Sequence, residues 1–243
     1  MHQQAFEGGH LAATRSKNLN DKTAETLGRR IVDGTYPEYS RMPGELELAK
    51  EFGAGRTRIR EAMQRLAAWG MVLVRPKHKT IVLPKQEWLH FDPAVITLRL
   101  KHGDRSNVFR DLSETRISVE PDVAYLAAER ATEADIEAME RAIERMKETS
   151  GNQRKFSAND AEFHRALFIS SENSFFYSFF LTLGTMLEVG IVSHQKPRRP
   201  DAPISEHTEI LNAVKEGDPD GAQKAMLNHL INSQREQRGH FGL

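Results

Sequence analysis

The chain has 243 residues, 39% of them hydrophobic, which is enough for two modest domains with cores of their own. It contains no cysteine, so disulfide bonds and thiolate metal sites are excluded. The net charge is zero, but residues 1–85 hold 15 Lys/Arg against 9 Asp/Glu, a local balance of +6 that suggests a small domain facing a polyanion.

The N-terminal residues 1–18 are expected to form a flexible tail, and they lack the apolar core of a signal peptide. No later run approaches the roughly 18 apolar residues of a membrane helix. We therefore expect a cytoplasmic protein without a membrane partner.

A basic domain with three helices and a hairpin is predicted for residues 19–84. Residues 21–36 have the apolar spacing of an amphipathic helix. The next run, ELELAKEFGAGRTRIREAMQRLAAWG, indicates a short helix, a turn at Gly53–Gly55 and a longer helix, which together make a helix-turn-helix unit. After Gly70, the alternation in MVLVRPKHKTIVLP around a basic tip indicates a β-hairpin wing.

The charge of this unit indicates its partner. Glu61 is the only acidic residue in a stretch that carries seven cations: Arg56, Arg58, Arg60, Arg65, Arg75, Lys77 and Lys79. Arg56 and Arg60 lie one turn apart at the start of the second helix, where a recognition helix contacts bases and phosphates. Any single arginine could belong to a solvated face. The glycine-containing turn, the basic start of the second helix and the basic hairpin together favour binding to double-stranded DNA.

The segment MPGELELAKEFGAGRTRIREAMQRLAAWGMVLVRPKHKTIVLP resembles the winged helix-turn-helix of the GntR transcription regulators. The resemblance implies that Arg56 and Arg60 contact an operator and that His78 lies near the minor groove. The residues assigned to DNA contact are Arg56, Thr57, Arg58, Arg60, Lys77, His78 and Lys79. Gly44, Leu46 and Lys79 depart from the family pattern, so the operator sequence is expected to differ while the class of function is retained.

The rest of the chain is expected to be helical. Residues 85–105 are interpreted as a linker in which Asp92 and Pro93 open a short helix. Residues 106–238 show no strand alternation, and helices are expected near 106–130, 133–149, 154–170, 173–195, 204–216 and 219–238. The predicted fold class is therefore mainly α, with a winged helix-turn-helix followed by an all-α six-helix bundle.

Polar residues interrupt the apolar stripes of three of these helices. Asp160 and His164 lie one turn apart on the stripe that also holds Phe163. His207 and His229 each share a face with apolar neighbours on later helices. One Asp and three His form an oxygen–nitrogen set that suits Zn, Ni, Mn or Fe, and bundle cores hold metals in this way. On the residues alone, hydrogen-bonded core histidines or a simple buried ion pair are alternatives.

The helical segment is similar to the FCD effector domain of the FadR branch of the GntR family. The similar stretches are LSETRISVEPDVAYLAAERAT, NDAEFHRALFISSEN and EHTEILNAVKEGDPDGAQKAMLNHL. The resemblance implies a divalent metal ion, with Zn favoured and Ni, Mn or Fe as alternatives, held by Asp160, His164, His207 and His229.

The same resemblance implies an effector pocket beside the ion. Arg116 would bind the carboxylate of the effector through parallel hydrogen bonds, and Asn173 would line the pocket. The alternatives are a surface salt bridge of Arg116 with Glu120 and a helix cap at Asn173.

These features together predict a ligand-responsive transcription regulator, favoured as a repressor, and not an enzyme. A homodimer would bind a palindromic operator, and a small carboxylic acid at the metal would release it. The run WLHFDPAVITLRL resembles a segment of galactonate-type regulators of sugar-acid catabolism, so a sugar acid is favoured over lactate-type or amino-acid-derived acids. One alternative is a metal-dependent hydrolase with a DNA-binding domain, although no obvious general base or nucleophile motif accompanies the ligands. The other is a DNA binder whose metal is purely structural.

Overall fold

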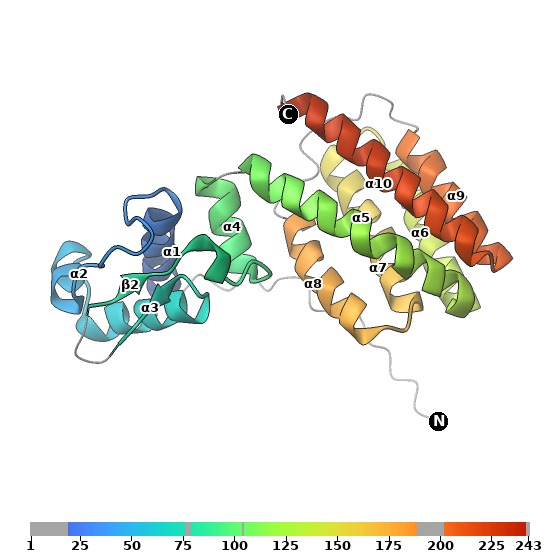
Figure 1. Ribbon diagram of the computed structural model, residues 1–243. Coiled ribbons are helices and arrows are strands. Elements are labelled where there is room, and N and C mark those ends of the chain that lie inside the picture. The colour runs from blue at the N-terminus through green and yellow to red at the C-terminus, as the bar shows by residue number, and fades with distance from the viewer. Residues whose placement is uncertain (1–18, 76–78, 104, 189–201, 242–243) are drawn as a thin grey trace. The chain divides into compact units, whose positions relative to one another are not determined.

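The computed structural model describes residues 19–75, 79–103, 105–188 and 202–241, and most of them are helical (Figure 1). The chain divides into two compact units, residues 1–103 and 104–243. The expected fold class is confirmed, because a helix-turn-helix with a small hairpin precedes a bundle of six helices. Within the described ranges, no helix combines the length and the apolar character needed to cross a membrane.

The first unit is a winged helix-turn-helix. Its elements are α1 (Leu19–Val32), α2 (Glu45–Glu51), α3 (Arg56–Ala68), β1 (Val72–Leu73), β2 (Ile81–Val82), the 3-10 helix η1 (Lys85–Glu87) and α4 (Pro93–His102). The two strands are antiparallel, with Val72 opposite Val82 and Leu73 opposite Ile81. Helices α1 and α3 pack together around fully buried Leu27, Ile59 and Leu66, so the helical spacing of the apolar residues produces the core.

The chain returns from α3 to the hairpin through Gly70. Gly70 has a φ of +71°, which a side chain rarely permits, and a Cβ atom there would lie 2.4 Å from the carbonyl oxygen of Glu87. Glycine therefore allows the backbone of η1 to approach the end of α3, and Leu89 N–H donates to the Trp69 carbonyl at 2.9 Å.

The segment expected to be a linker is largely helical and belongs to the first unit. Trp88 is buried, and its Nε1 donates to the Leu83 carbonyl at 3.1 Å. Val95 and Leu98 of α4 lie in the same core cluster as α1 and α3. Asp92 caps α4 as expected, since its side chain accepts a hydrogen bond from Ala94 N–H at 2.8 Å.

The second unit consists of helices only, within the ranges that the structure describes. They are α5 (Arg105–Arg130), α6 (Glu133–Glu148), α7 (Gln153–Ser170), α8 (Ser174–Glu188), α9 (Ala202–Glu216) and α10 (Pro219–Phe241). Helix α5 packs on α7, α9 and α10, and α9 packs on α10, so the inner faces of these four helices enclose one interior (Figure 1). The start of each helix matches its expected position to within two residues.

Candidate metal centre and DNA-binding face

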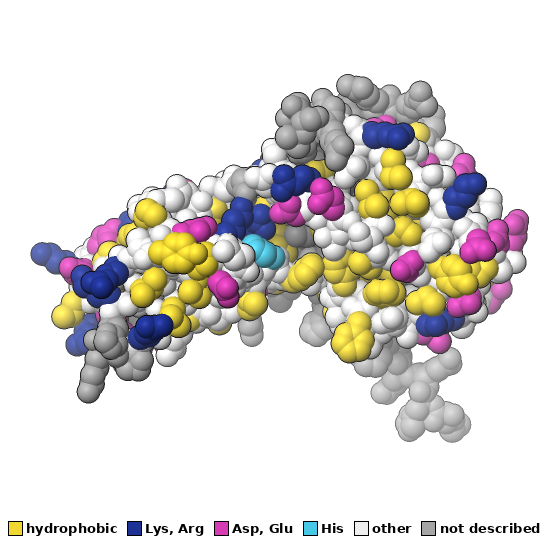
Figure 2. Space-filling view, in the orientation of Figure 1, with side chains coloured by type: hydrophobic (Ala, Val, Ile, Leu, Met, Phe, Trp, Pro, Cys, Tyr) yellow, Lys and Arg dark blue, Asp and Glu magenta, His cyan; other side chains and the backbone are white. Residues whose placement is uncertain are grey.

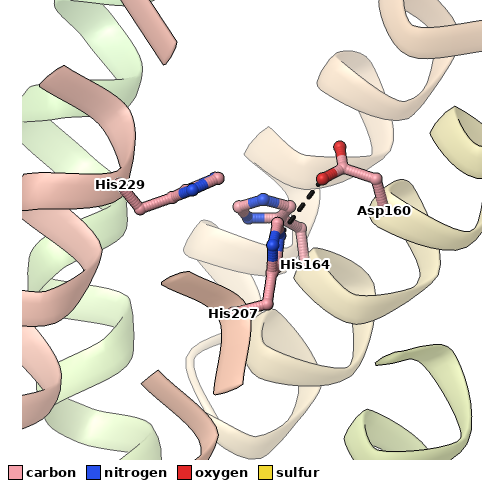
Figure 3. A group of neighbouring side chains, drawn as sticks. All are labelled: Asp160, His164, His207 and His229. Atoms are coloured by element: carbon pink, nitrogen blue, oxygen red, sulfur yellow. Dashed lines mark ion pairs between the residues drawn. The ribbon is translucent and has the colours of Figure 1, made fainter. Parts of the chain in front are cut away.

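One aspartate and three histidines meet in the interior of the bundle (Figure 3). Helix α7 supplies Asp160 and His164, α9 supplies His207, and α10 supplies His229. One ligand atom from each residue lies within 4.8 Å of the ligand atoms of the others. Because zinc bonds to nitrogen and oxygen are about 2.0–2.2 Å long and point to the corners of a tetrahedron, the ligand atoms of one ion lie roughly 3.3–3.6 Å apart. A small inward shift of the side chains would therefore complete a coordination sphere.

The histidine rings are buried and turned toward one another. The ring centroids of His207 and His229 are 4.4 Å apart, and His164 lies 5.4 Å from His207 and 5.5 Å from His229. Phe163 packs edge-on against His207 at 4.7 Å and forms an apolar wall of the cluster. An interior site of this kind needs polar partners for its nitrogens, since unpaired buried polar atoms cost free energy.

His207 shows why a cation fits between these side chains. Its Nδ1 lies 2.5 Å from the Pro203 carbonyl oxygen, which can only accept a hydrogen bond, so Nδ1 carries the ring proton. In the neutral ring Nε2 then has a lone pair, and it faces Asp160 Oδ1 at 3.1 Å. This nitrogen is buried and has no aligned hydrogen-bond partner among the described residues. A cation between nitrogen and carboxylate would satisfy both acceptors.

Two glutamates lie behind the other histidines. Glu206 Oε2 is 2.9 Å from His229 Nδ1, and Glu120 Oε2 is 2.8 Å from His164 Nδ1. A carboxylate behind a ligating histidine is a frequent arrangement in metal sites, where it sets the orientation of the ring. Each of the three histidines thus has an oxygen near Nδ1, although the contact of His164 with Glu120 is not aligned as a hydrogen bond, and the Nε2 nitrogens are the candidate ligand atoms.

The environment sets the protonation states of Asp160, Glu120 and His229. Burial would raise the pKa of Asp160, but the contact with His207 and the nearby imidazoles of His164 and His229 outweigh this effect and hold the pKa well below its usual range. For Glu120, the charges of Arg116 and His164 overcome the same effect of burial and lower the pKa. Burial lowers the pKa of His229 to about 4. At neutral pH the carboxylates are ionised and His229 is neutral, as ligand chemistry demands.

The two residues expected to contact an effector lie in different settings. Arg116 is buried and pairs with Glu120 through Nε and Nη2, and its Nη2 is 3.4 Å from His164 Nε2. The salt bridge considered as an alternative is therefore formed, but inside the bundle beside the histidines. Asn173 caps α8, since its Oδ1 accepts from Phe175 N–H at 3.0 Å.

The residues expected to contact DNA lie at the start of α3 and on the wing. Arg56, Thr57 and Arg60 are exposed, and Arg58 is half-buried. Lys79 is exposed just before β2, whereas the expected contacts Lys77 and His78 lie outside the described residues. Figure 2 shows basic side chains on the surface of this unit, interspersed with acidic and hydrophobic ones.

Glu45, at the start of α2, contacts both arginines of the expected recognition surface. Arg60 Nε and Nη2 donate to its two oxygens at 3.2 and 3.1 Å, and Arg56 Nη2 lies 4.0 Å away. Sequence reasoning missed Glu45, Glu120 and Glu206 as members of the two sites. Spacing within one helix carried a signal only for Glu120, which follows Arg116 by one turn.

Comparison with known proteins gives both units a family. Residues 19–82 match the profile described as "Bacterial regulatory proteins, gntR family", and residues 111–232 match the profile of the FCD domain. The second match spans Asp160, His164 and His207 on α7 and α9, and also His229 on α10.

Individual relatives match along nearly their whole length. The chain is 28% identical over 220 residues to the galactonate operon transcriptional repressor of Escherichia coli K12, covering 90% of this chain and 96% of the relative. It is 31% identical over 212 residues to the uncharacterized HTH-type transcriptional regulator YieP of the same organism, covering 86% and 91%. Among solved structures, Streptococcus agalactiae GntR aligns with a TM-score of 0.51 and 27% identity, covering 89% of this chain and 99% of that one.

Proposed function

We propose that this protein is a repressor that a small carboxylic acid releases from DNA. The chain belongs to the gntR family of bacterial regulatory proteins and carries a C-terminal FCD domain, so it is a transcription regulator and not an enzyme. The metal-dependent hydrolase considered from the sequence is not favoured, since the relatives are named as regulators or repressors.

The observation that carries the proposal is the convergence of Asp160, His164, His207 and His229 within 4.8 Å. Such a donor set binds a divalent metal, and we propose zinc, because three imidazoles and a carboxylate match its preferred ligands. When bound, the ion would supply positive charge to an incoming carboxylate, which would bind it as a fifth ligand. The burial of the cluster keeps water from screening that charge.

Arg116 is proposed as the second contact for the effector. Its guanidinium lies beside His164 and is engaged by Glu120, so an effector carboxylate would share its hydrogen-bond donors with that glutamate. Asn173 is proposed as a further contact of the effector; its Oδ1 caps α8, so its amide nitrogen is the group that would donate to the effector.

The N-terminal unit is proposed to bind double-stranded operator DNA. A homodimer would place two α3 helices in successive major grooves of a palindromic site. The proposed contacts are Arg56, Thr57, Arg58 and Arg60 of α3 with Lys77, His78 and Lys79 of the wing. The exposure of Arg56 and Arg60 in the first two turns of α3 supports this assignment.

A sugar acid is the proposed effector class. The supporting observation is the similarity to a galactonate operon repressor over 96% of that protein. Such an acid has one carboxylate for the ion and Arg116, and several hydroxyl groups for other polar partners. It acts as an inducer only if it binds the DNA-released state more tightly than the DNA-bound state.

The test is an operator-binding titration with the zinc-loaded full chain. Galactonate and related aldonic or uronic acids should weaken binding, and the same acids should have no effect on the Asp160→Ala variant. L-lactate and an amino acid serve as comparison ligands. If the parent protein and the Asp160→Ala variant respond equally, the metal is not the effector site; if no acid changes the affinity of either protein, ligand control by acids is wrong.

A further inference from the structure

Both side-chain oxygens of Glu206 are bonded to helix α10. Glu206 Oε2 accepts from His229 Nδ1 at 2.9 Å, and Oε1 accepts from Asn232 Nδ2 at 2.8 Å. His229 and Asn232 are three residues apart and therefore lie on the same face of α10. The carboxylate is held at two points, so it cannot turn away from the histidine without breaking the bond to Asn232.

This contact determines which nitrogen of His229 faces the cluster. A neutral imidazole carries one N–H, and the partner of that N–H fixes the tautomer. The carboxylate accepts from Nδ1–H, which leaves the lone pair on Nε2. The bond also restricts rotation of the ring, which is buried among His164 and His207.

Glu206 differs from the partners of the other two histidines. The Nδ1 of His207 meets a neutral backbone carbonyl, that of Pro203. The carboxylate beside His164 belongs to Glu120, whose charge is offset by Arg116. In contrast, Asn232 is neutral and leaves the negative charge of Glu206 directed at His229. The Nδ1 nitrogen of His229 therefore faces a carboxylate whose other partner is neutral.

The position of Glu206 in the chain adds a link between two helices. It precedes the ligand His207 on α9, so this helix provides one ligand and orients the ligand on α10. Successive residues on a helix point about 100° apart. Glu206 can therefore reach α10 while His207 points to the cluster.

We propose that Glu206 is a positioning residue of the metal centre, which holds His229 in the Nδ1–H form with Nε2 directed at the ion and, with Asn232, ties α9 to α10. This inference rests on the proposed metal site. Loss of such a partner behind a ligating histidine lowers metal affinity about 10–100-fold.

The experiment measures metal affinity of the full chain by competition with a chelator, with Zn²⁺ and with Co²⁺ as a spectroscopic probe. Glu206→Ala should bind both ions about 10–100-fold more weakly than the parent. Glu206→Gln keeps an oxygen that can accept from Nδ1–H but loses the charge, so its loss should be smaller. Glu209→Gln is the matched control, because Glu209 is exposed on the same helix, and it should bind as the parent does.

A second readout separates positioning from a general loss of structure. Nitrogen-15 spectra of the metal-free protein should show His229 with the proton on Nδ1, and Glu206→Ala should lose this fixed form. The histidine signals of His164 and His207 should keep their positions in that variant. If Glu206→Ala unfolds, the nitrogen-15 signals of His229 are compared instead in Glu206→Gln and Asn232→Ala. These variants leave more of the contact between residue 206 and His229 in place.

Asp160→Ala distinguishes the failure of this inference from the failure of the metal site. If Asp160→Ala loses the metal while Glu206→Ala binds within twofold of the parent and keeps the Nδ1–H form, Glu206 has no positioning role. If Asp160→Ala binds the metal as the parent does, the proposed metal site is wrong and the inference falls with it. Weakened binding in Glu206→Ala together with the altered His229 signal supports the proposal.

Discussion

Glu45 of α2 and Arg60 of α3 form a two-point ion pair across the helix-turn-helix. Arg60 Nε donates to Glu45 Oε1 at 3.2 Å, and Arg60 Nη2 donates to Oε2 at 3.1 Å. The Arg60 side chain is 59% exposed, so water and salt screen the pair and it contributes little to stability. Its consequence is geometric, because the planar guanidinium is held near the start of the proposed recognition helix.

Replacement of Arg60 tests the DNA-binding face. If Arg60 contacts a base edge, Arg60→Ala should weaken operator binding roughly 10- to 100-fold, with discrimination lost at one base position. Arg29→Ala, an exposed arginine on α1, is the matched control and should change affinity much less. Gel-shift titrations at fixed salt measure both. Equal affinities for Arg60→Ala and the parent protein would remove Arg60 from the interface.

Removal of the Glu45 charge should separate affinity from specificity. Glu45→Gln takes a negative charge away from a surface that approaches phosphates, so binding to non-operator DNA should become tighter. Because Arg60 is then held less firmly, the ratio of operator to non-operator affinity should fall. Glu47→Gln, on the same helix, is the control. An unchanged ratio in Glu45→Gln would show that Glu45 does not orient Arg60.

The periodicity of apolar residues was sufficient to predict the helices and the inward faces of the bundle. Asp160 and His164 could be placed together because a helix sets the direction of residues four apart. The meeting of His207 and His229 with them was suggested by shared apolar faces and by the family resemblance, and their convergence was then seen in the structure. For these four residues, the faces predicted from helical periodicity are the faces that the packing of the helices turns toward one another.

Contacts between different helices could not be predicted in the same way. Glu206 reaches His229 only because α9 and α10 lie side by side, and Glu45 reaches Arg60 only because the turn brings α2 against α3. No spacing within one helix specifies such pairs. Trp88 was expected to pack on a neighbouring domain, but the sequence did not indicate that Val95 and Leu98 would also join the core of the first unit, since their burial depends on the surface that receives them.

Metal removal should lower the stability of the folded chain. An ion that binds only the folded state stabilises it by about 2.7 kcal/mol when its free concentration is 100 times the dissociation constant. Thermal unfolding of the parent should therefore shift several degrees lower with a chelator and recover when zinc is restored. Asp160→Ala should show no chelator-dependent shift. A parent protein that unfolds at the same temperature with and without zinc would contradict metal binding at this cluster.

Gly70→Ala should destabilise the winged unit. The positive φ of Gly70 costs a non-glycine residue about 1–3 kcal/mol, and the added Cβ would also press on the Glu87 carbonyl oxygen. Gly151→Ala is the control, because Gly151 does not have a positive φ and nothing lies within 4 Å of the position of its Cβ. The unfolding free energy from urea titration should fall in the first variant and stay nearly constant in the second. Equal stability of both would mean that the η1 backbone moves away at no cost.

Arg116 requires two variants, because its roles in folding and in effector binding are separable. Arg116→Ala would leave Glu120 buried without its partner, and breaking a buried pair in this way costs about 3–5 kcal/mol. Its loss of effector response would therefore say nothing about contact with the effector.

Arg116→Lys keeps a positive charge beside Glu120 but replaces the two-pronged donor by a single ammonium group. We expect this variant to unfold within a few degrees of the parent protein and to keep its metal affinity. The concentration of sugar acid needed to release the operator should rise at least tenfold, since the parallel hydrogen bonds to a carboxylate are lost. Thermal unfolding, chelator competition and operator titration measure the three quantities on one preparation. A parental effector response in Arg116→Lys would place the carboxylate on the metal alone and leave Arg116 as the partner of Glu120.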